Sequence, residues 1–168
     1  LANSLVRRMY AWRGYRTELH RQSLEDPNHV TLAAWQYDEV VATLTLRRDS
    51  AGGLLADAHY GDVLEGLRRP DRVVCEVSRL AIDPDFSSRE LLHGLFRAAL
   101  DYGREHFSAS DAVMEVNPRH VGYYQRCLGF QQIGDLRQCQ RVDAPAVLLH
   151  QEIEEITIPD DVVLPAER

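Results

Sequence analysis

The chain has 168 residues, 45% of them hydrophobic and 27% charged, with a formal net charge of −7. This length suits one domain, and no run approaches the roughly 18 apolar residues of a membrane span, so we expect a soluble globular protein. An odd number of cysteines without Cys-x-x-Cys spacing argues against a disulfide framework and a zinc knuckle and favours a cytoplasmic protein: Cys75, Cys127 and Cys139.

Most of the negative charge lies at the C-terminal end. The last 18 residues hold six acids and one arginine, a net −5, which leaves −2 for the rest of the chain. A nucleic-acid partner is therefore not expected, because such partners need a dense basic face. We expect one domain over residues 1–153 and an acidic tail over 154–168 that is loosely ordered or held by a partner contact.

The first half of the chain predicts a helix followed by strands. Apolar residues at helical spacing predict a helix over residues 4–20 that Gly14 can kink. Two β-rich runs, 29–36 and 40–48, are separated by a three-residue polar segment and predict an antiparallel hairpin. A short helix over 59–69 and a strand over 73–82, with apolar residues on both faces, follow.

The second half alternates helices and strands. A broad apolar stripe predicts a helix over 88–107, which packs on the sheet. A strand over 112–116, a helix over 118–128 capped by Asn117, and closing strands over 130–133 and 146–153 complete the chain. Strand, helix and strand in succession imply partly parallel pairing through a right-handed crossover, so the sequence predicts an α/β (α+β) fold.

The connection after the strand over 73–82 has an unusual composition. A strand, a tight turn and a helix N-terminus commonly hold phosphate, and glycine in the turn lets bare N–H groups approach it. Here the turn has no glycine. Ser87 and Glu90 instead have the spacing of a capping box, so we expect the helix to satisfy its own free N–H groups.

Several motifs resemble a known enzyme family. Residues 81–84 (AIDP) and 117–130 (NPRHVGYYQRCLGF) are similar to GNAT-type N-acyltransferases. The segments 47–50 (RRDS), 75–81 (CEVSRLA) and 143–146 (DAPA) more narrowly resemble the long-chain N-acyl amino acid synthases, which are relatives of the N-acyl homoserine lactone synthases. The resemblance implies a GNAT-type acyltransferase fold with a central mixed, twisted sheet flanked by helices on both faces.

The family resemblance also concerns the acyl donor. Acetyltransferases of this group close a glycine pattern around the pyrophosphate of coenzyme A, whereas residues 87–92 (SSRELL) lack both glycines. We expect no tightly bound cofactor and an acyl-phosphopantetheine thioester on acyl-carrier protein as the donor. An alternative is that the loop has lost donor binding altogether. The residues expected to contact the pantetheine arm are Ser87, Ser88, Arg89, Asn117 and His120.

An acidic carrier protein needs a basic patch on its partner. Each arginine is by itself a common surface residue, so the sequence proposes only a set of docking candidates. The set consists of Arg68, Arg69, Arg72, Arg89, Arg97 and Arg126.

Acyl transfer to an amine requires a base, an acid and an oxyanion site. Glu76 lies among apolar residues of a strand, so it is either the base or a partner of Arg79. By resemblance, Tyr124 protonates the leaving thiolate, with a phenol pKa near that of a thiol, whereas Tyr123 packs in the core. Backbone N–H groups of Leu80, Ala81 and Ile82 are expected to hold the oxyanion.

An amino-acid acceptor also presents a carboxylate, which suits arginine. The candidates are Arg79 and Arg119, with Arg47 behind them. We expect no metal and no covalent intermediate, since the sequence shows neither a His/Cys cluster nor a Ser/His/Asp set. An apolar acyl slot could be lined by residues that are equally suited to the core: Leu44, Leu46, Val113 and Val147.

Together these features predict an N-acyltransferase that moves a medium or long acyl chain from acyl-carrier protein to the amine of an amino acid. Three alternatives stay open. The acceptor could be S-adenosylmethionine, as in a homoserine lactone synthase, or the donor could be acetyl coenzyme A. The chain could also be a non-catalytic module that binds acyl groups or carrier protein.

Overall fold

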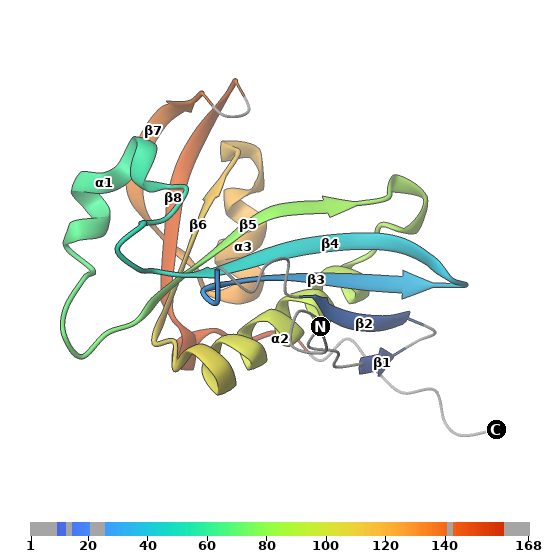
Figure 1. Cartoon of the computed structure of the whole chain (residues 1–168). Helices are drawn as coiled ribbons and strands as arrows, with labels where there is room; N and C mark the ends of the chain where they lie inside the picture. The colour runs from blue at the N-terminus through green and yellow to red at the C-terminus, as the bar shows by residue number, and fades with distance from the viewer. Residues whose placement is uncertain (1–9, 13–14, 21–25, 141–142, 160–168) are drawn as a thin grey trace.

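The computed structural model describes residues 10–12, 15–20, 26–140 and 143–159. Over these residues the chain forms one eight-stranded sheet in the order β1-β2-β3-β4-β5-β6-β8-β7, shown in Figure 1. Neighbouring strands are antiparallel except for β5 and β6. The strands are β1 (Tyr10–Trp12), β2 (Tyr15–His20), β3 (His29–Gln36), β4 (Glu39–Arg48), β5 (Val74–Ile82), β6 (Asp111–Val116), β7 (Gln131–Cys139) and β8 (Ala144–Glu152).

The helix predicted over residues 4–20 is wrong for the described part of that range. Residues Tyr10–Trp12 and Tyr15–His20 are strands, and β2 pairs with β3 from Arg16↔Trp35 to His20↔Thr31. The remaining positions of the prediction lie outside the described residues. Helical spacing of a few apolar residues was a weaker signal than a strand-pairing partner distant in sequence.

The hairpin of β3 and β4 is confirmed. Tyr37 and Asp38 form its two-residue turn and both have positive φ angles, 50° and 66°, as a type I′ turn requires. Glu39, expected in the turn, pairs with Gln36 and starts β4. The strands predicted at 73–82 and 112–116 correspond closely to β5 and β6.

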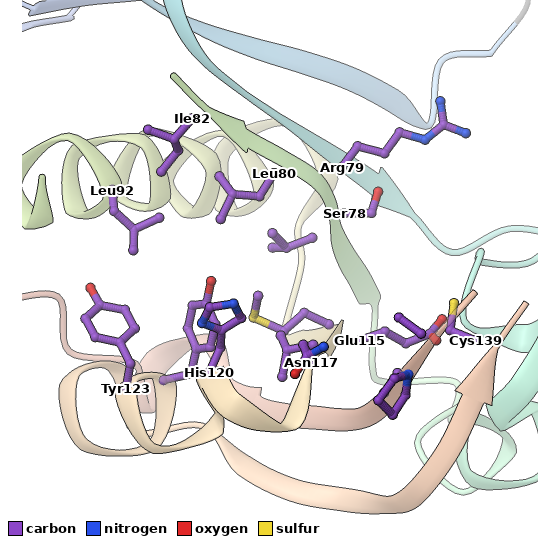
Figure 2. A pocket seen from close by; sticks show the side chains of 17 residues that line it. Ser78, Arg79, Leu80, Ile82, Leu92, Glu115, Asn117, His120, Tyr123 and Cys139 are labelled. Carbon is purple, nitrogen blue, oxygen red and sulfur yellow. The ribbon is translucent and has the colours of Figure 1, made fainter. Parts of the chain in front are cut away.

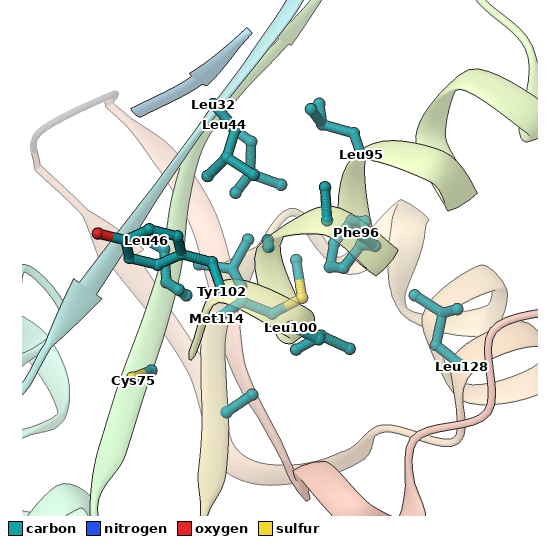
Figure 3. Close-up of a cluster of buried hydrophobic side chains, with 14 of the residues drawn as sticks. Leu32, Leu44, Leu46, Cys75, Leu95, Phe96, Leu100, Tyr102, Met114 and Leu128 are labelled. Atoms are coloured by element: carbon teal, nitrogen blue, oxygen red, sulfur yellow. The ribbon is translucent and has the colours of Figure 1, made fainter. Parts of the chain in front are cut away.

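Helices cover both faces of the sheet. On one face, α2 (Arg89–Phe107) packs Leu95 and Phe96 against Leu32 and Leu44 in the larger core, drawn in Figure 3. On the other face, α1 (Asp57–Glu65) contributes to a smaller buried cluster. That cluster comprises Leu54, Ala56, Tyr60, Leu64, Val74, Val113 and Leu148.

The apolar stripe of α2 predicted both its bounds and its buried face. The helix predicted over 59–69 is α1, which begins two residues earlier and ends before Gly66. The helix predicted over 118–128 begins as a 3₁₀ turn, Pro118–His120, and continues as α3 (Val121–Leu128). Asn117 caps this turn, as expected, by accepting a hydrogen bond from Arg119 N at 3.1 Å.

Strand β7 is longer than the run predicted over 130–133. Tyr60 of α1 holds it in place, because its hydroxyl shares its one proton between Asp135 O, at 2.7 Å, and Ala146 O, at 2.8 Å. A Cβ at Gly134 would lie 2.6 Å from the Tyr60 ring, so glycine permits this close approach. The anchor joins residues far apart in sequence, and local pattern alone did not predict it.

The start of the acidic tail contacts the body. Residues Ile153–Glu155 form a 3₁₀ turn, and Ile156 and Ile158 pack against the larger core. The boundary at residue 153 stays a prediction. Within the described part of the chain, no helix is both long enough and apolar enough to cross a membrane.

Candidate active site

The two parallel strands at the centre of the sheet separate partway along their length. β5 and β6 pair from Val74↔Asp111 to Glu76↔Val113, and no later residue of either strand pairs with the other in the described chain. We call residues 77–82 of β5 and 114–116 of β6 the splayed segment, and the residues before them the paired segment. A cavity of about 680 Å³ opens at the splayed segment.

A β-bulge turns β5 away from β6. Ser78 pairs with Thr45 and Ala81 with Thr43, so two residues of β5, Arg79 and Leu80, lie opposite one residue of β4. Arg79 takes a left-handed backbone conformation with φ 52°. An extra residue on one strand bends it locally, which accounts for the separation.

The bulge also sets which backbone N–H groups face the cavity. Asp83 donates its N–H to Val41 O at 2.8 Å and therefore faces β4. Since N–H groups alternate along a strand, Ala81 faces β4 as well, and Leu80 and Ile82 direct theirs into the splayed segment. Of the three N–H groups expected to hold the oxyanion, the geometry favours Leu80 and Ile82.

The cavity has an apolar end and a polar end. Figure 2 shows Ile82, Leu92 and Tyr123 at one end and Arg79, Glu115 and Cys139 at the other. Among the described residues that line it, Glu115 is the one acid and Arg79 the one arginine, and Figure 2 shows the exposed guanidinium of Arg79 pointing away from the cavity. The apolar wall consists of Val77, Leu80, Ile82, Leu92, Met114 and Val116.

Six of the predicted site residues line this cavity, and seven lie outside its wall. The first group comprises Arg79, Leu80, Ile82, Asn117, His120 and Tyr124, and the second comprises Glu76, Ala81, Arg47, Arg119, Ser87, Ser88 and Arg89. The four residues proposed for the acyl slot, Leu44, Leu46, Val113 and Val147, are buried in the two cores and not in the cavity wall.

Glu76 is buried beneath the N-terminus of α1. Its side chain is 1% exposed, and its two carboxylate oxygens accept hydrogen bonds from Leu55 N and Ala56 N, both at 2.8 Å. The carboxylate thus holds the chain that leads into α1. Arg79, expected as its alternative partner, lies in the bulge with an exposed side chain.

Tyr124 lies in the cavity wall but is buried. Burial raises the pKa of its hydroxyl to about 12. The phenol is therefore a weaker acid than expected from the sequence, where its pKa was taken to lie near that of a thiol. Tyr123, expected in the core, also lines the cavity, and its hydroxyl contacts Nε2 of the buried His93. The aromatic pair therefore offers two hydroxyl groups to the cavity.

The N-terminus of α2 is capped by Ser88. Its Oγ accepts a hydrogen bond from Leu91 N at 3.1 Å, whereas Ser87 ends the preceding 3₁₀ turn. The Ser87–Glu90 capping box was therefore wrong by one residue, although the helix does satisfy part of its own terminus. Asp83 and Asp85 lie exposed in the same connection, and Glu90 adds an acid to the first turn of α2.

The candidate docking arginines differ in their surroundings. Arg68 binds Asp49, Asp57 and Glu65, and Arg72 binds Asp111 and Glu152, so these two stabilise the fold. Arg47 similarly pairs with Asp26 at 2.9 Å. Exposed side chains remain on α2, α3 and the loop before β5: Arg89, Arg97, Arg126 and Arg69.

A polar cluster that the sequence analysis did not predict lies beside the polar end of the cavity. His59 of α1, Glu115 of β6 and Cys139 of β7 bring their donor atoms within 4.8 Å of one another. The side chain of Glu115 is only 4% exposed, and its Oε2 lies 3.8 Å from His59 Nδ1. A charged residue inside the apolar strand 111–116 was the one local signal for it.

The chain is similar to known proteins in both sequence and structure. The family model described as N-acyl amino acid synthase FeeM matches residues 2–152. The structure of FeeM, from uncultured soil microbes, is similar with a TM-score of 0.72 and 28% identity, covering 79% of this chain and 73% of that one. A search of curated proteins gave no match.

Two lactone synthases share the fold. The acyl-homoserine lactone synthase LasI has a TM-score of 0.60 and 17% identity, covering 74% of this chain and 64% of that one. The coenzyme-A-dependent synthase BjaI, solved with SAM and isopentyl-CoA, has a TM-score of 0.58 and 16% identity, covering 78% and 61%. The chain spans less than two thirds of the length of either, and at these identities the likeness concerns the fold alone.

Proposed function

The chain belongs to the N-acyl amino acid synthase FeeM family and is an N-acyltransferase, and on that premise we propose that it moves a medium or long fatty acyl chain from acyl-carrier protein to the amine of an amino acid. The observation that carries the proposal is the cavity at the splayed segment. Its wall is apolar at one end, where an acyl thioester can lie, and includes Glu115 at the other, with the exposed side chain of Arg79 at the rim. An amino-acid zwitterion has the complementary pair of charges.

The donor is proposed from the chemistry of the α2 N-terminus. Ser88 takes up one of the free N–H groups, and the connection and first turn of α2 hold three acids, Asp83, Asp85 and Glu90, against the one cation Arg89. A pyrophosphate needs bare N–H groups and a positive field, so we expect the N-terminus of α2 to bind coenzyme A weakly. A carrier protein presents a single phosphodiester and can be held by its own surface, which supports carrier protein as the donor.

The transfer itself needs few protein groups. The N–H groups of Leu80 and Ile82 stabilise the oxyanion of the tetrahedral intermediate. Tyr124 gives its proton to the pantetheine thiolate as the carbon–sulfur bond breaks, and its raised pKa keeps the hydroxyl protonated at neutral pH. Arg79 binds the carboxylate of the acceptor. Asn117 and His120, in the cavity wall, contact the pantetheine arm.

The proposal is tested by incubating the purified protein with dodecanoyl- and hexadecanoyl-carrier protein and pooled amino acids, with product detection by mass spectrometry. We expect N-acyl amino acids. The same acyl groups on coenzyme A form the matched donor arm, with a kcat/KM at least about tenfold lower, roughly 1.4 kcal/mol.

Folded protein that gives no N-acyl product with any acceptor contradicts the proposed function. Equal kcat/KM values for the two donors contradict the carrier assignment alone. A third arm supplies S-adenosylmethionine as acceptor, and a lactone product in preference to N-acyl amino acids identifies a homoserine lactone synthase instead.

A further inference from the structure

Two glutamates lie on the same face of neighbouring strands but in different surroundings. On β6, Val113 faces the cluster beneath α1, and strand alternation places Glu115 on that face too. Glu76 on β5 pairs with Val113 and is covered by the α1 connection. Because β5 has turned away by the level of Glu115, that side chain lies in the cavity wall, with its two buried oxygens beside Cys139 at the polar end, as Figure 2 shows.

His59 lies beside Glu115 and is held in place through its other ring nitrogen. Its Nε2 accepts a hydrogen bond from Gln140 N at 3.2 Å, which places the proton of the neutral ring on Nδ1. Nδ1 lies 3.8 Å from Glu115 Oε2. The ring therefore presents a proton and not a lone pair on the side of the carboxylate, at a distance that is longer than a hydrogen bond but favours the charged form of Glu115.

From this geometry we propose that Glu115 is the catalytic base that binds and deprotonates the acceptor amine, and that His59 is its positioning residue. The inference rests on the proposed function, because it assigns a step of that same reaction. It replaces the sequence-based choice of Glu76, whose two oxygens are engaged by backbone amides outside the cavity wall.

The protons of the reaction balance through this arrangement. The acceptor arrives as an ammonium ion, and the Glu115 carboxylate takes one proton to leave a neutral amine. The amine nitrogen forms a bond to the thioester carbon, the carbon–sulfur bond breaks, and the nitrogen loses a second proton as the amide forms. One proton ends on the pantetheine sulfur, and the other is released to solvent.

Cys139 beside this pair raises the alternative of a metal site, since histidine, carboxylate and thiolate are zinc ligands. A metal bound at Nδ1 of His59 would move the ring proton to Nε2, where it would face the N–H of Gln140. Two donors cannot satisfy each other, so the geometry favours the proton-transfer role.

The base is tested with acceptors that differ in charge. Glycine needs deprotonation at neutral pH, whereas aminooxyacetate has a similar shape and carboxylate but a nucleophilic nitrogen that is already neutral. We expect Glu115→Gln to lower kcat/KM for glycine, or for the preferred amino acid, by about 100-fold or more, a typical general-base effect. With aminooxyacetate the loss falls below about fivefold.

Equal losses with both acceptors, or no loss with either, overturn the assignment. An inactive wild type counts against the proposed function and not against this residue. Glu76→Gln is the matched control. Per folded molecule, we expect its ratio of kcat/KM for glycine to kcat/KM for aminooxyacetate to equal that of the wild type. A charge-dependent loss at Glu76 in place of Glu115 also overturns the proposal.

The positioning residue is tested by a conservative rescue. His59→Asn keeps a donor near the position of Nδ1, and His59→Leu removes it. We expect the asparagine variant to retain the wild-type ratio of glycine to aminooxyacetate turnover and the leucine variant to lose it. If wild-type activity requires a stoichiometric bound metal that a chelator removes, the cluster is a metal site and the proposal fails.

Discussion

The paired and splayed segments of β5 and β6 each contain a buried glutamate, but the two glutamates have different roles. In the paired segment, Glu76 is buried under the N-terminus of α1, and its carboxylate accepts hydrogen bonds from the Leu55 and Ala56 amides. In the splayed segment, Glu115 has the same chemical group and a nearly closed environment, but a 680 Å³ cavity lies beside it. A carboxylate that completes a backbone turn stabilises the fold, whereas one that faces a cavity can exchange protons with a substrate.

The bulge at Arg79 creates this difference. Had β5 continued to pair with β6, the cavity would be filled by a regular strand, and Glu115 would be covered as Glu76 is. One inserted residue therefore opens a site in an otherwise continuous sheet. Substitutions in the paired segment should consequently affect stability, and those in the splayed segment should affect turnover.

The largest effect is expected at Glu76. Glu76→Gln turns a charged acceptor into a group that faces one amide with its own N–H₂, and we expect a loss of about 3 kcal/mol in the free energy of unfolding. Urea unfolding of the variant and the wild type measures the difference. A variant as stable as the wild type would show that the buried carboxylate has no structural role.

Tyr124 comes next, in the wall of the cavity. Tyr124→Phe should lower kcat by about 100-fold, at the low end for a general acid, because a hydroxyl of pKa about 12 is poorly matched to a thiol. Tyr123→Phe is the control on the neighbouring hydroxyl and should lose less. Steady-state kinetics of both variants decide between them, and a larger loss at Tyr123 would transfer the acid role to that residue.

Strand and helix positions were predictable where local patterns were strong, as at 29–36, 73–82 and 88–107. The Asn117 cap was predictable for the same reason, since the residue acts on its own neighbours. Three features were not predictable from the sequence, because each depends on a partner distant in sequence. They are the strands β1 and β2, the length of β7 and the contact between His59 and Glu115. Glu76 was predicted to be the base because it lies in a buried strand. In the structure the buried carboxylate accepts hydrogen bonds from two backbone amides.

Carrier docking should respond to charge on α2. Arg89→Glu combined with Arg97→Glu should lower kcat/KM for acyl-carrier protein by about tenfold through a slower encounter, and should leave acyl-pantetheine unaffected. Arg69→Glu is the matched control, since Arg69 lies before the N-terminal end of β5, whereas α2 begins after the C-terminal end of that strand. A similar loss with both donors, or an equal loss in the control, would argue against docking at α2.

The last effect is absent at neutral pH and concerns Cys75 in the paired segment. Burial raises the pKa of its thiol from 9.0 to about 12, so at alkaline pH the unfolded state ionises first. Stability should fall between about pH 9 and pH 12 by about 1 kcal/mol per pH unit. Cys75→Ala should be less stable at neutral pH but show a flatter decline, as unfolding curves at several pH values will measure; an unchanged slope would contradict the assignment.

The most direct test of the account is a crystal structure with an N-acyl amino acid product bound. We expect the amide between β5 and β6 at the splayed segment, with the product carboxylate at Arg79, the amide nitrogen toward Glu115 and the acyl chain along the apolar wall. A product seated elsewhere on the molecule, with this cavity filled only by water, would contradict it.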